Sequence, residues 1–220
     1  MASPSLTTPT PAQLSRLVHP VEEHAPGLFA GDPGLIGLPS FIVGAVALGL
    51  VQIGLVPAGM TGASIPIILA ATSIGLLVAT IWAAAIGQSA VAGIYGIFTG
   101  FYLSYAVLVL GLVHNWFGIT PAAIADTQKL FVISWMVIVT VLVAASVRLP
   151  VLFTGMFALV DVALLLNLLS IIQNNSVTLA KAAGWVVMAF SAVGLYLFFG
   201  ATWKATGGKE LPAGRPIIRA

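Results

Sequence analysis

Six long apolar stretches divide this chain, and each has about 20 residues, the length that a helix needs to cross the hydrocarbon core of a bilayer. In that core no water is available to backbone N–H and C=O groups, so only helices and closed barrels can span it. Charged residues make up 6% of the sequence, against about 25% in a soluble domain, so they are too few to cover a water-soluble fold. We therefore predict an all-α membrane protein. Its six transmembrane helices are expected at Leu35–Val56, Ser64–Trp82, Ala90–Leu112, Leu130–Val147, Leu149–Ile172 and Val177–Trp203.

These spans define a membrane domain at residues 32–203, with a cytoplasmic tail on either side of it. Residues 1–31 begin with a segment rich in Pro, Ser and Thr and have too little apolar content to fold, so a largely disordered tail is expected. Residues 204–220 form the second tail. The turn at Arg148-Leu149-Pro150 is so short that the fourth and fifth spans must run antiparallel.

The distribution of Lys and Arg predicts the orientation of the spans, because cytoplasmic loops carry an excess of these residues. The termini and the even-numbered loops share one side of the membrane. That side carries Arg16, Arg148, Lys204, Lys209, Arg215 and Arg219. The other side carries only Lys129 and Lys181. Both termini of this multi-pass protein are therefore expected on the cytoplasmic side of the cell membrane.

A weak internal repeat relates the two halves of the membrane domain. At one constant offset, Asp32 matches Asp126 and residues 100–103 match residues 194–197. Three spans in each half would make the two halves inverted repeats, an architecture common in transporters, in which the substrate site lies at the repeat interface. The alternative is coincidence between apolar segments of similar composition.

Asp161 is the one charged residue within the fifth span. A carboxylate at the bilayer centre costs about 2.5–3.5 kcal/mol on the insertion scale, so it must be protonated, paired or beside water. An acid in this position is a functional candidate by default, and we treat Asp161 as a candidate proton site. The alternative is a structural Asp that is hydrogen-bonded inside the bundle and fixes two helices together.

The third span carries an aromatic stripe. Tyr95, Phe98, Tyr102 and Tyr105 recur at helical spacing, with Thr99 beside them. A buried tyrosine hydroxyl needs a hydrogen-bond partner, so this face is expected to line a protein interior or a wet cavity. The alternative is an ordinary stripe of core or lipid-facing aromatics.

Motifs for enzymatic chemistry are absent from the sequence. It has no cysteine, no HExxH, no GxSxG and no phosphate loop, and no pair of His or acidic residues has metal-ligand spacing within a span. Its Lys and Arg residues form no basic face for nucleic acid. We therefore expect no enzyme activity, no cofactor, no metal and no nucleic-acid partner, and the composition favours a transporter or channel.

Several motifs resemble those of one known family. Residues 32–38, Asp-Pro-Gly-Leu-Ile-Gly-Leu, are followed by Phe41. They resemble Asn-Pro-Ala-Pro-Leu-Gly-Leu, the signature of the acetate uptake transporter family of YaaH-type succinate–acetate/proton symporters. In this chain Asp replaces the Asn, Gly replaces the Ala, and Leu replaces the second Pro. Further similar residues are Gln128, Trp135, Arg148, Ala183-Gly184-Trp185, Tyr196 and Leu211-Pro212-Ala213-Gly214. The resemblance thus covers about residues 32–214.

This resemblance implies a six-helix protomer with its own pore, assembled as a homohexamer in the lipid bilayer. By matching position, the apolar constriction of the family's pore becomes Phe41, Phe98 and Val160, with Phe98 in place of a Tyr and Val160 in place of a Leu. The neck is then expected to be slightly wider and drier, and to favour a neutral acid, because a dry neck penalises bare charge. The expected substrate pathway comprises Asp32, Pro33, Leu38, Tyr95, Thr99 and Tyr102.

Asp161 departs from the family, whose members usually have Thr there. A permanent anion beside the neck would repel acetate, so either Asp161 is protonated when substrate passes or the substrate is not an anion. Because it follows Val160 directly, it points about 100° away from that residue on a helix and could instead face a neighbouring helix.

The leading functional hypothesis is a proton-coupled transporter or channel for acetate and related short carboxylates, with succinate among the candidates. A passive channel for a small neutral solute such as urea or a short amide is the alternative, because such a pore would tolerate Asp161. A membrane scaffold or sensor is a third hypothesis, disfavoured by the small amount of sequence outside the spans.

Overall fold

The computed structural model of the chain describes residues 30–218. Almost all of the predicted N-terminal tail, at residues 1–29, lies outside the described residues, as do residues 219–220. The described elements are the helices α2 (Gly34–Ile53), η1 (Ala58–Ser64), η2 (Ile67–Thr72), α3 (Ser73–Ala85), α4 (Ser89–Val113), η3 (Pro121–Ala123), α5 (Ile124–Ala145), η4 (Ser146–Arg148), α6 (Val151–Ile172) and α7 (Val177–Ala205).

The described chain confirms the predicted all-α fold with six membrane-spanning helices. Six helical segments are long and apolar enough to cross a bilayer, and they agree with the predicted spans to within a few residues at most ends. The chain is therefore a multi-pass membrane protein. Consecutive spans alternate in direction, as the inverted repeat requires, but the repeat itself stays a prediction.

The fourth span begins earlier than the sequence pattern indicated. The prediction placed its start at Leu130, whereas the helical segment begins at Pro121 and α5 at Ile124. The extra turns end in the polar residues 126–129, where Lys129 Nζ lies 2.8 Å from Asp126 Oδ1 in an (i, i+3) ion pair. A search for apolar runs stops at these polar residues, although their (i, i+3) pairing is compatible with a helix.

The second span is a composite helix. It passes from the 3₁₀ turn η1 through the π-helical segment η2 into α3. Within it the Ser73 hydroxyl donates a hydrogen bond of 2.8 Å to the carbonyl of Ile68. A π-helical turn inserts an extra residue and rotates the side chains that follow, so the apolar faces before and after η2 are offset.

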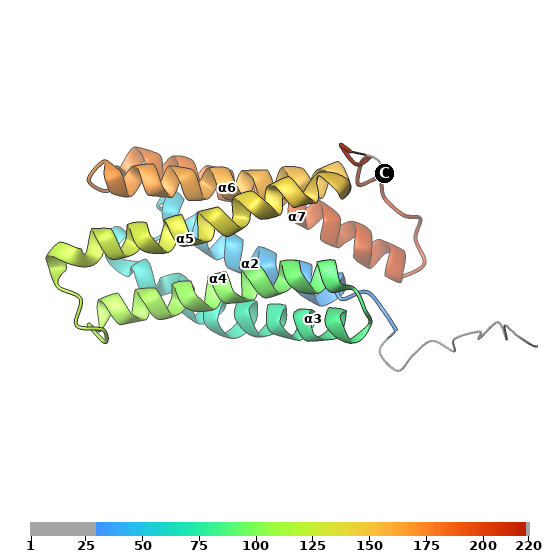
Figure 1. Cartoon of the computed structure of the whole chain (residues 1–220), viewed down its shortest axis with the longest axis horizontal. Helices are drawn as coiled ribbons and strands as arrows, with labels where there is room; N and C mark the ends of the chain where they lie inside the picture. Colours follow the sequence, from blue (N-terminus) through green and yellow to red (C-terminus); the bar gives the residue numbers. More distant parts are fainter. Residues whose placement is uncertain (1–29, 219–220) are drawn as a thin grey trace, which may run out of the picture. The chain divides into compact units, whose positions relative to one another are not determined.

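The first and last helices pack closely against each other. α2 contacts α7 more extensively than it contacts any other helix, and α6 packs between α7 and α5 (Figure 1). Gly184 of α7 permits the close approach, because a Cβ at this position would lie 2.8 Å from the Cβ of Gln52 and 3.0 Å from the backbone nitrogen of Ile53. Small residues at such contacts let transmembrane helices gain dispersion energy along their backbones.

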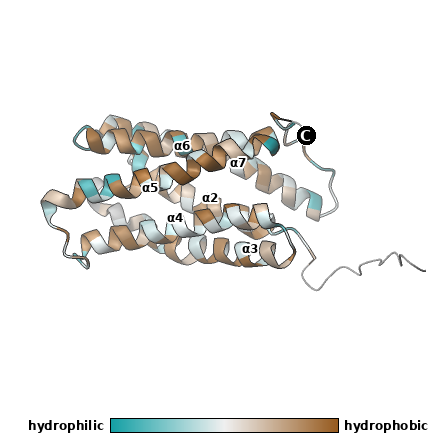
Figure 2. Cartoon of the chain, in the orientation of Figure 1, coloured by the Kyte–Doolittle hydropathy of each residue, from teal (hydrophilic) through white to brown (hydrophobic). Residues whose placement is uncertain are grey.

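Hydropathy varies along the length of each helix (Figure 2). Hydrophobic residues cover their middle parts, and hydrophilic residues gather near their ends. Many large apolar side chains are exposed on the outer surface of α3, α5 and α7, which is the expected state of groups that face acyl chains or a neighbouring protein in the membrane.

The segment after α7 returns to the start of α6. The carbonyl of Ala213 accepts a hydrogen bond of 3.2 Å from the backbone N–H of Leu152, and the Tyr196 hydroxyl donates one of 3.0 Å to the carbonyl of Pro212. Farther along, the N–H of Ile217 bonds to the carbonyl of Val147 at 3.0 Å. Residues 211–217 therefore hold the turn between α5 and α6. We call the end of the bundle where α2 begins and α7 ends the terminal end, and the other the loop end.

The orientation of the chain in the membrane can be tested with two single-cysteine variants, because the sequence has no cysteine. Thr120→Cys lies at the loop end just before η3, and Glu210→Cys lies at the terminal end after α7, and both native side chains are exposed. We expect an impermeant thiol reagent added to intact cells to label position 120 and to reach position 210 only after permeabilisation. Labelling of both positions from the same side would contradict the topology.

Candidate functional site

Two cavities lie inside the helical bundle. The larger, of about 610 Å³, is lined by residues of α2, α4, α5, α6 and α7, and reaches the loop end at Val113, Gln128 and Asn175. The smaller, of about 300 Å³, lies toward the terminal end near Asp32 and Gln88. Both are far larger than the volume of one water molecule, so small solutes fit within them.

Phe41 of α2 and Phe98 of α4 are the two residues shared by the walls of both cavities. Their ring centroids are 4.7 Å apart with an interplanar angle of 63°, an edge-to-face contact. Each side chain is only 3% exposed. The two cavities therefore meet at an apolar aromatic contact.

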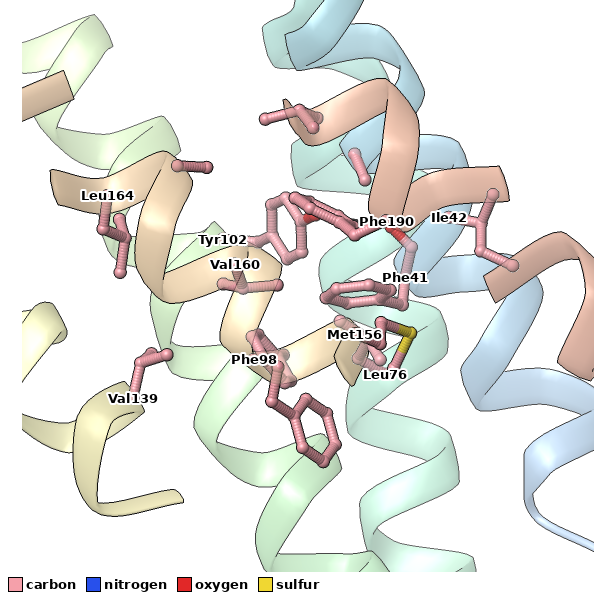
Figure 3. Packing of buried hydrophobic residues seen from close by; sticks show 14 of the residues in the cluster. Phe41, Ile42, Leu76, Phe98, Tyr102, Val139, Met156, Val160, Leu164 and Phe190 are labelled. Carbon is pink, nitrogen blue, oxygen red and sulfur yellow. Dashed lines mark hydrogen bonds between the residues drawn. The ribbon is translucent and has the colours of Figure 1, made fainter. Parts of the chain in front are cut away.

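Further apolar side chains surround this pair (Figure 3). Phe41 packs against Phe190 and Tyr102 with ring centroids 5.8 Å and 5.9 Å apart, and Val160 of α6 lies beside them in the wall of the larger cavity. The three residues predicted to form a constriction, which come from three different helices, thus lie together where the cavities meet. That they form the narrowest point of a pore stays a prediction.

The predicted pathway residues divide into two groups. Leu38, Tyr95 and Asp32 line the smaller cavity, and Tyr102 lines the larger one. Asp32 also satisfies a backbone donor at the start of α2, because its Oδ1 accepts a hydrogen bond of 2.8 Å from the N–H of Gly34.

Pro33 and Thr99 do not belong to the wall of either cavity, so the structure does not place them on the predicted pathway. Pro33 is fully buried where α2 begins. The Thr99 hydroxyl donates a hydrogen bond of 2.8 Å to the carbonyl of Tyr95, one turn earlier in the same helix. A threonine that bonds to its own helix in this way needs no partner in a cavity.

Gly37 explains how the signature segment positions Tyr95. A Cβ at Gly37 would overlap the ring of Tyr95, so only glycine leaves room for that ring against α2. The Tyr95 side chain thereby reaches the smaller cavity near Asp32. The glycine of the signature is thus a packing requirement of the cavity wall.

Sequence reasoning assigned no site role to the polar side chains of the larger cavity. Gln52 of α2 and Asn167 of α6 both line it, and Gln52 Nε2 donates a hydrogen bond of 3.0 Å to Asn167 Oδ1. Gln128 and Asn175 lie in the same wall. The available signal was the presence of amide side chains within or beside apolar spans, because such groups need partners in the membrane.

Asp161 lies next to the cavity-lining Val160 but belongs to the wall of neither cavity. Its Oδ1 and Oδ2 accept hydrogen bonds of 3.1 Å and 3.0 Å from the hydroxyl of Thr140, which is exposed on α5. Val137, about one turn before Thr140, and Val141, the next residue, are also exposed. The carboxyl therefore lies between α5 and α6 on the outer surface of a single chain.

The cavity walls contain little charge. Asp32 is the one Asp, Glu, Lys, Arg or His among the described residues that line them. Within residues 30–218 there is also no group of three or more His, Cys, Asp or Glu side chains that could hold a metal ion. A solute in these cavities meets aromatic rings, aliphatic side chains, amides and hydroxyls.

The chain is similar to known proteins both in sequence and in fold. The sequence model of the GPR1/FUN34/yaaH family matches residues 15–208. The fold is similar to the solved structure of the bacterial acetate channel SatP, with a TM-score of 0.70 and 18% sequence identity over 86% of this chain and 98% of that chain. A search of curated proteins found no match.

Truncation of Phe98 tests whether the aromatic contact limits passage. We expect Phe98→Ala to raise the permeability of butyrate relative to acetate about tenfold, equivalent to about 1.4 kcal/mol of barrier, because it removes one ring from between the cavities. Uptake into proteoliposomes measures both solutes. Phe199→Ala is the matched control, since Phe199 is 56% exposed on α7 and lines neither cavity. An unchanged ratio in Phe98→Ala would mean that the constriction lies elsewhere.

Proposed function

The chain belongs to the GPR1/FUN34/yaaH family, so it is a transport protein rather than an enzyme, and we propose on this premise that it conducts acetate and related short carboxylic acids across the cell membrane. The observation that carries this proposal is the pair of cavities that approach from opposite ends of the bundle and meet at Phe41 and Phe98. Such an arrangement gives one six-helix chain its own pathway.

The form of the substrate follows from the cavity walls. A carboxylate ion would find no Lys, Arg or His side chain among the described residues of those walls, and it would have to leave water to pass the aromatic contact. Desolvation of an unpaired ion costs far more than desolvation of a neutral polar group. We infer that the acid crosses in its neutral form.

Proton coupling then requires no separate proton-binding side chain. A neutral acid brings its own proton from the side of lower pH and releases it on the other side. The neutral fraction of a weak acid falls about tenfold with each pH unit above its pKa, so a pH gradient drives net movement. Succinate would have to lose both of its charges, so it is a poorer substrate in this proposal than acetate.

A passive channel for urea or a short amide is the second candidate. The same walls favour it, because they contain the amides Gln52 and Asn167 and no Lys, Arg or His among the described residues. The two candidates differ in pH dependence: entry of an amide is independent of pH, whereas entry of an acid follows the concentration of its neutral form.

The position of Asp161 supports assembly with further copies of the chain. The Asp161–Thr140 pair lies on the outer surface among exposed apolar side chains of α5. A carboxyl that faces acyl chains is costly, whereas one covered by protein can be hydrogen-bonded. We propose that a neighbouring protomer of a homohexamer covers this face, with both termini of each chain in the cytoplasm.

Uptake into proteoliposomes tests the proposed function. We expect radiolabelled acetate to accumulate when the outside is acidic relative to the lumen, and its initial rate to fall about tenfold per pH unit when the outside pH is raised above the pKa of the acid. Urea serves as the neutral comparison, and protein-free liposomes give the background flux of neutral acid through lipid. Urea entry without protein-dependent acetate entry would replace the proposed function with the second candidate.

Asp161→Asn tests the role of the isolated carboxyl. The variant keeps the shape and the acceptor for Thr140 but cannot titrate. Because Asp161 lines neither cavity, we expect acetate accumulation driven by a pH gradient to stay within about twofold of wild type, the range typical of surface substitutions. Retained exchange of acetate combined with lost accumulation would instead assign to Asp161 the proton-carrying role predicted from the sequence.

A further inference from the structure

The larger cavity contains an amide pair with a defined orientation. Gln52 Nε2 donates to Asn167 Oδ1 at 3.0 Å, and Asn167 Nδ2 donates to the backbone carbonyl of Ala163 at 2.8 Å. The Ala163 carbonyl can only accept a hydrogen bond, so the nitrogen of Asn167 must face it. The oxygen of Asn167 then faces Gln52, which must present its own nitrogen. The assignment of both amides follows from this chain of hydrogen bonds.

This orientation leaves the oxygen of Gln52 without a partner. Gln52 Oε1 is buried and accepts no hydrogen bond from any described residue. Two other buried side-chain oxygens in residues 30–218 share this property, those of Ser64 and Thr72, and neither residue lines a cavity. A buried acceptor without a partner in a cavity wall calls for a bound donor.

The surroundings define which donor fits. The wall of the larger cavity includes the rings of Phe101, Tyr105 and Phe131 and contains no Asp, Glu, Lys, Arg or His among the described residues. A bound cation would have no counterion there, and a carboxylate has only acceptors to offer to the acceptor of Gln52. A small neutral group that carries both O–H or N–H and a carbonyl satisfies the site.

We propose that Gln52, held by Asn167, is a binding site in the larger cavity for a neutral carboxylic acid or a primary amide. Because Gln52 Oε1 is buried, binding turns the end of this side chain toward the cavity, where the solute's O–H or N–H donates to Oε1 and its carbonyl can accept the second N–H of Gln52. The site rejects the carboxylate, because two acceptors would then face each other in a buried position. This inference rests on the proposed transport of small weak acids, and it adds that primary amides share the same site.

A pair that served only to join α2 and α6 would behave differently. Its loss would lower the stability of the bundle but would leave the relative affinities of solutes unchanged. The decisive readout is therefore competition between an acid and an amide, together with its change when the oxygen of Gln52 is removed.

The experiment measures uptake of radiolabelled acetate and acetamide into proteoliposomes of the full chain. In wild type we expect acetamide to enter and to inhibit acetate uptake competitively. Gln52→Met, which keeps the length of the side chain and removes the acceptor, should weaken this inhibition about tenfold, the effect of losing one buried hydrogen bond. Gln173→Met is the matched control: Gln173 is an exposed glutamine directly after α6 that lines neither cavity, and its loss should change the inhibition less than about twofold.

Two results would overturn the inference. If acetate enters but acetamide neither enters nor competes in wild type, the site does not bind amides, although the proposed function stands. If Gln52→Met and Gln173→Met shift the inhibition equally, the Gln52 oxygen is not the recognition group. Absence of protein-dependent acetate uptake would contradict the proposed function instead, and entry of acetamide that depends on Gln52 would still support the site. Size-exclusion chromatography checks the assembly of each variant. If Gln52→Met does not assemble, inhibition of acetate uptake by acetamide in wild type is the measurement that tests the inference.

Discussion

The hydrocarbon core of a bilayer offers no hydrogen-bond partners, and this constraint accounts for the polar contacts within the six spans. Hydroxyls satisfy it locally: Thr99 and Ser191 each bond to the carbonyl one turn earlier in their own helix. Other side chains bond across helices, as Thr140 of α5 does to Asp161 of α6 and Gln52 of α2 does to Asn167 of α6. One pair faces outward and the other faces a cavity. Their different surroundings separate a structural contact from a candidate binding site.

Close packing positions the apolar part of the pathway. Phe41 and Phe98 come from helices that are apart in the sequence, and their rings meet because glycines elsewhere on α2 remove steric barriers. Gly37 accommodates the ring of Tyr95, and Gly44 accommodates the side chain of Thr72 from η2. Added side chains at these positions would have to push α4 or the second span away from α2. The cavity walls thus depend on residues that contribute no side chain to them.

The sequence predicted the spans well because long apolar runs report directly on membrane crossing, and the resemblance of residues 32–38 to a family signature led to Phe41 and Phe98. The sequence showed that a carboxylate at Asp161 is energetically costly in the membrane, but it did not show the direction of this side chain. Helical spacing gives the angles between side chains on one helix and does not say which neighbouring helix each face contacts. Gln52 and Asn167 are 115 residues apart, with no periodic pattern to link them. Thr99 was placed on the pathway by its position in an aromatic stripe, yet its hydroxyl is used within α4.

The close contact between α2 and α7 bears on how the protein is made. Chains emerge N-terminus first, so α2 is the first described span to enter the membrane, and its most extensive partner is the last. Until α7 is synthesised, the surface of α2 around Gln52 and Ile53 has no Gly184 to cover it. The bundle therefore cannot close progressively from its N-terminal side. Biogenesis must keep α2 within reach of α7 through the insertion of four intervening spans, and the cavities are complete only once α7 has been inserted.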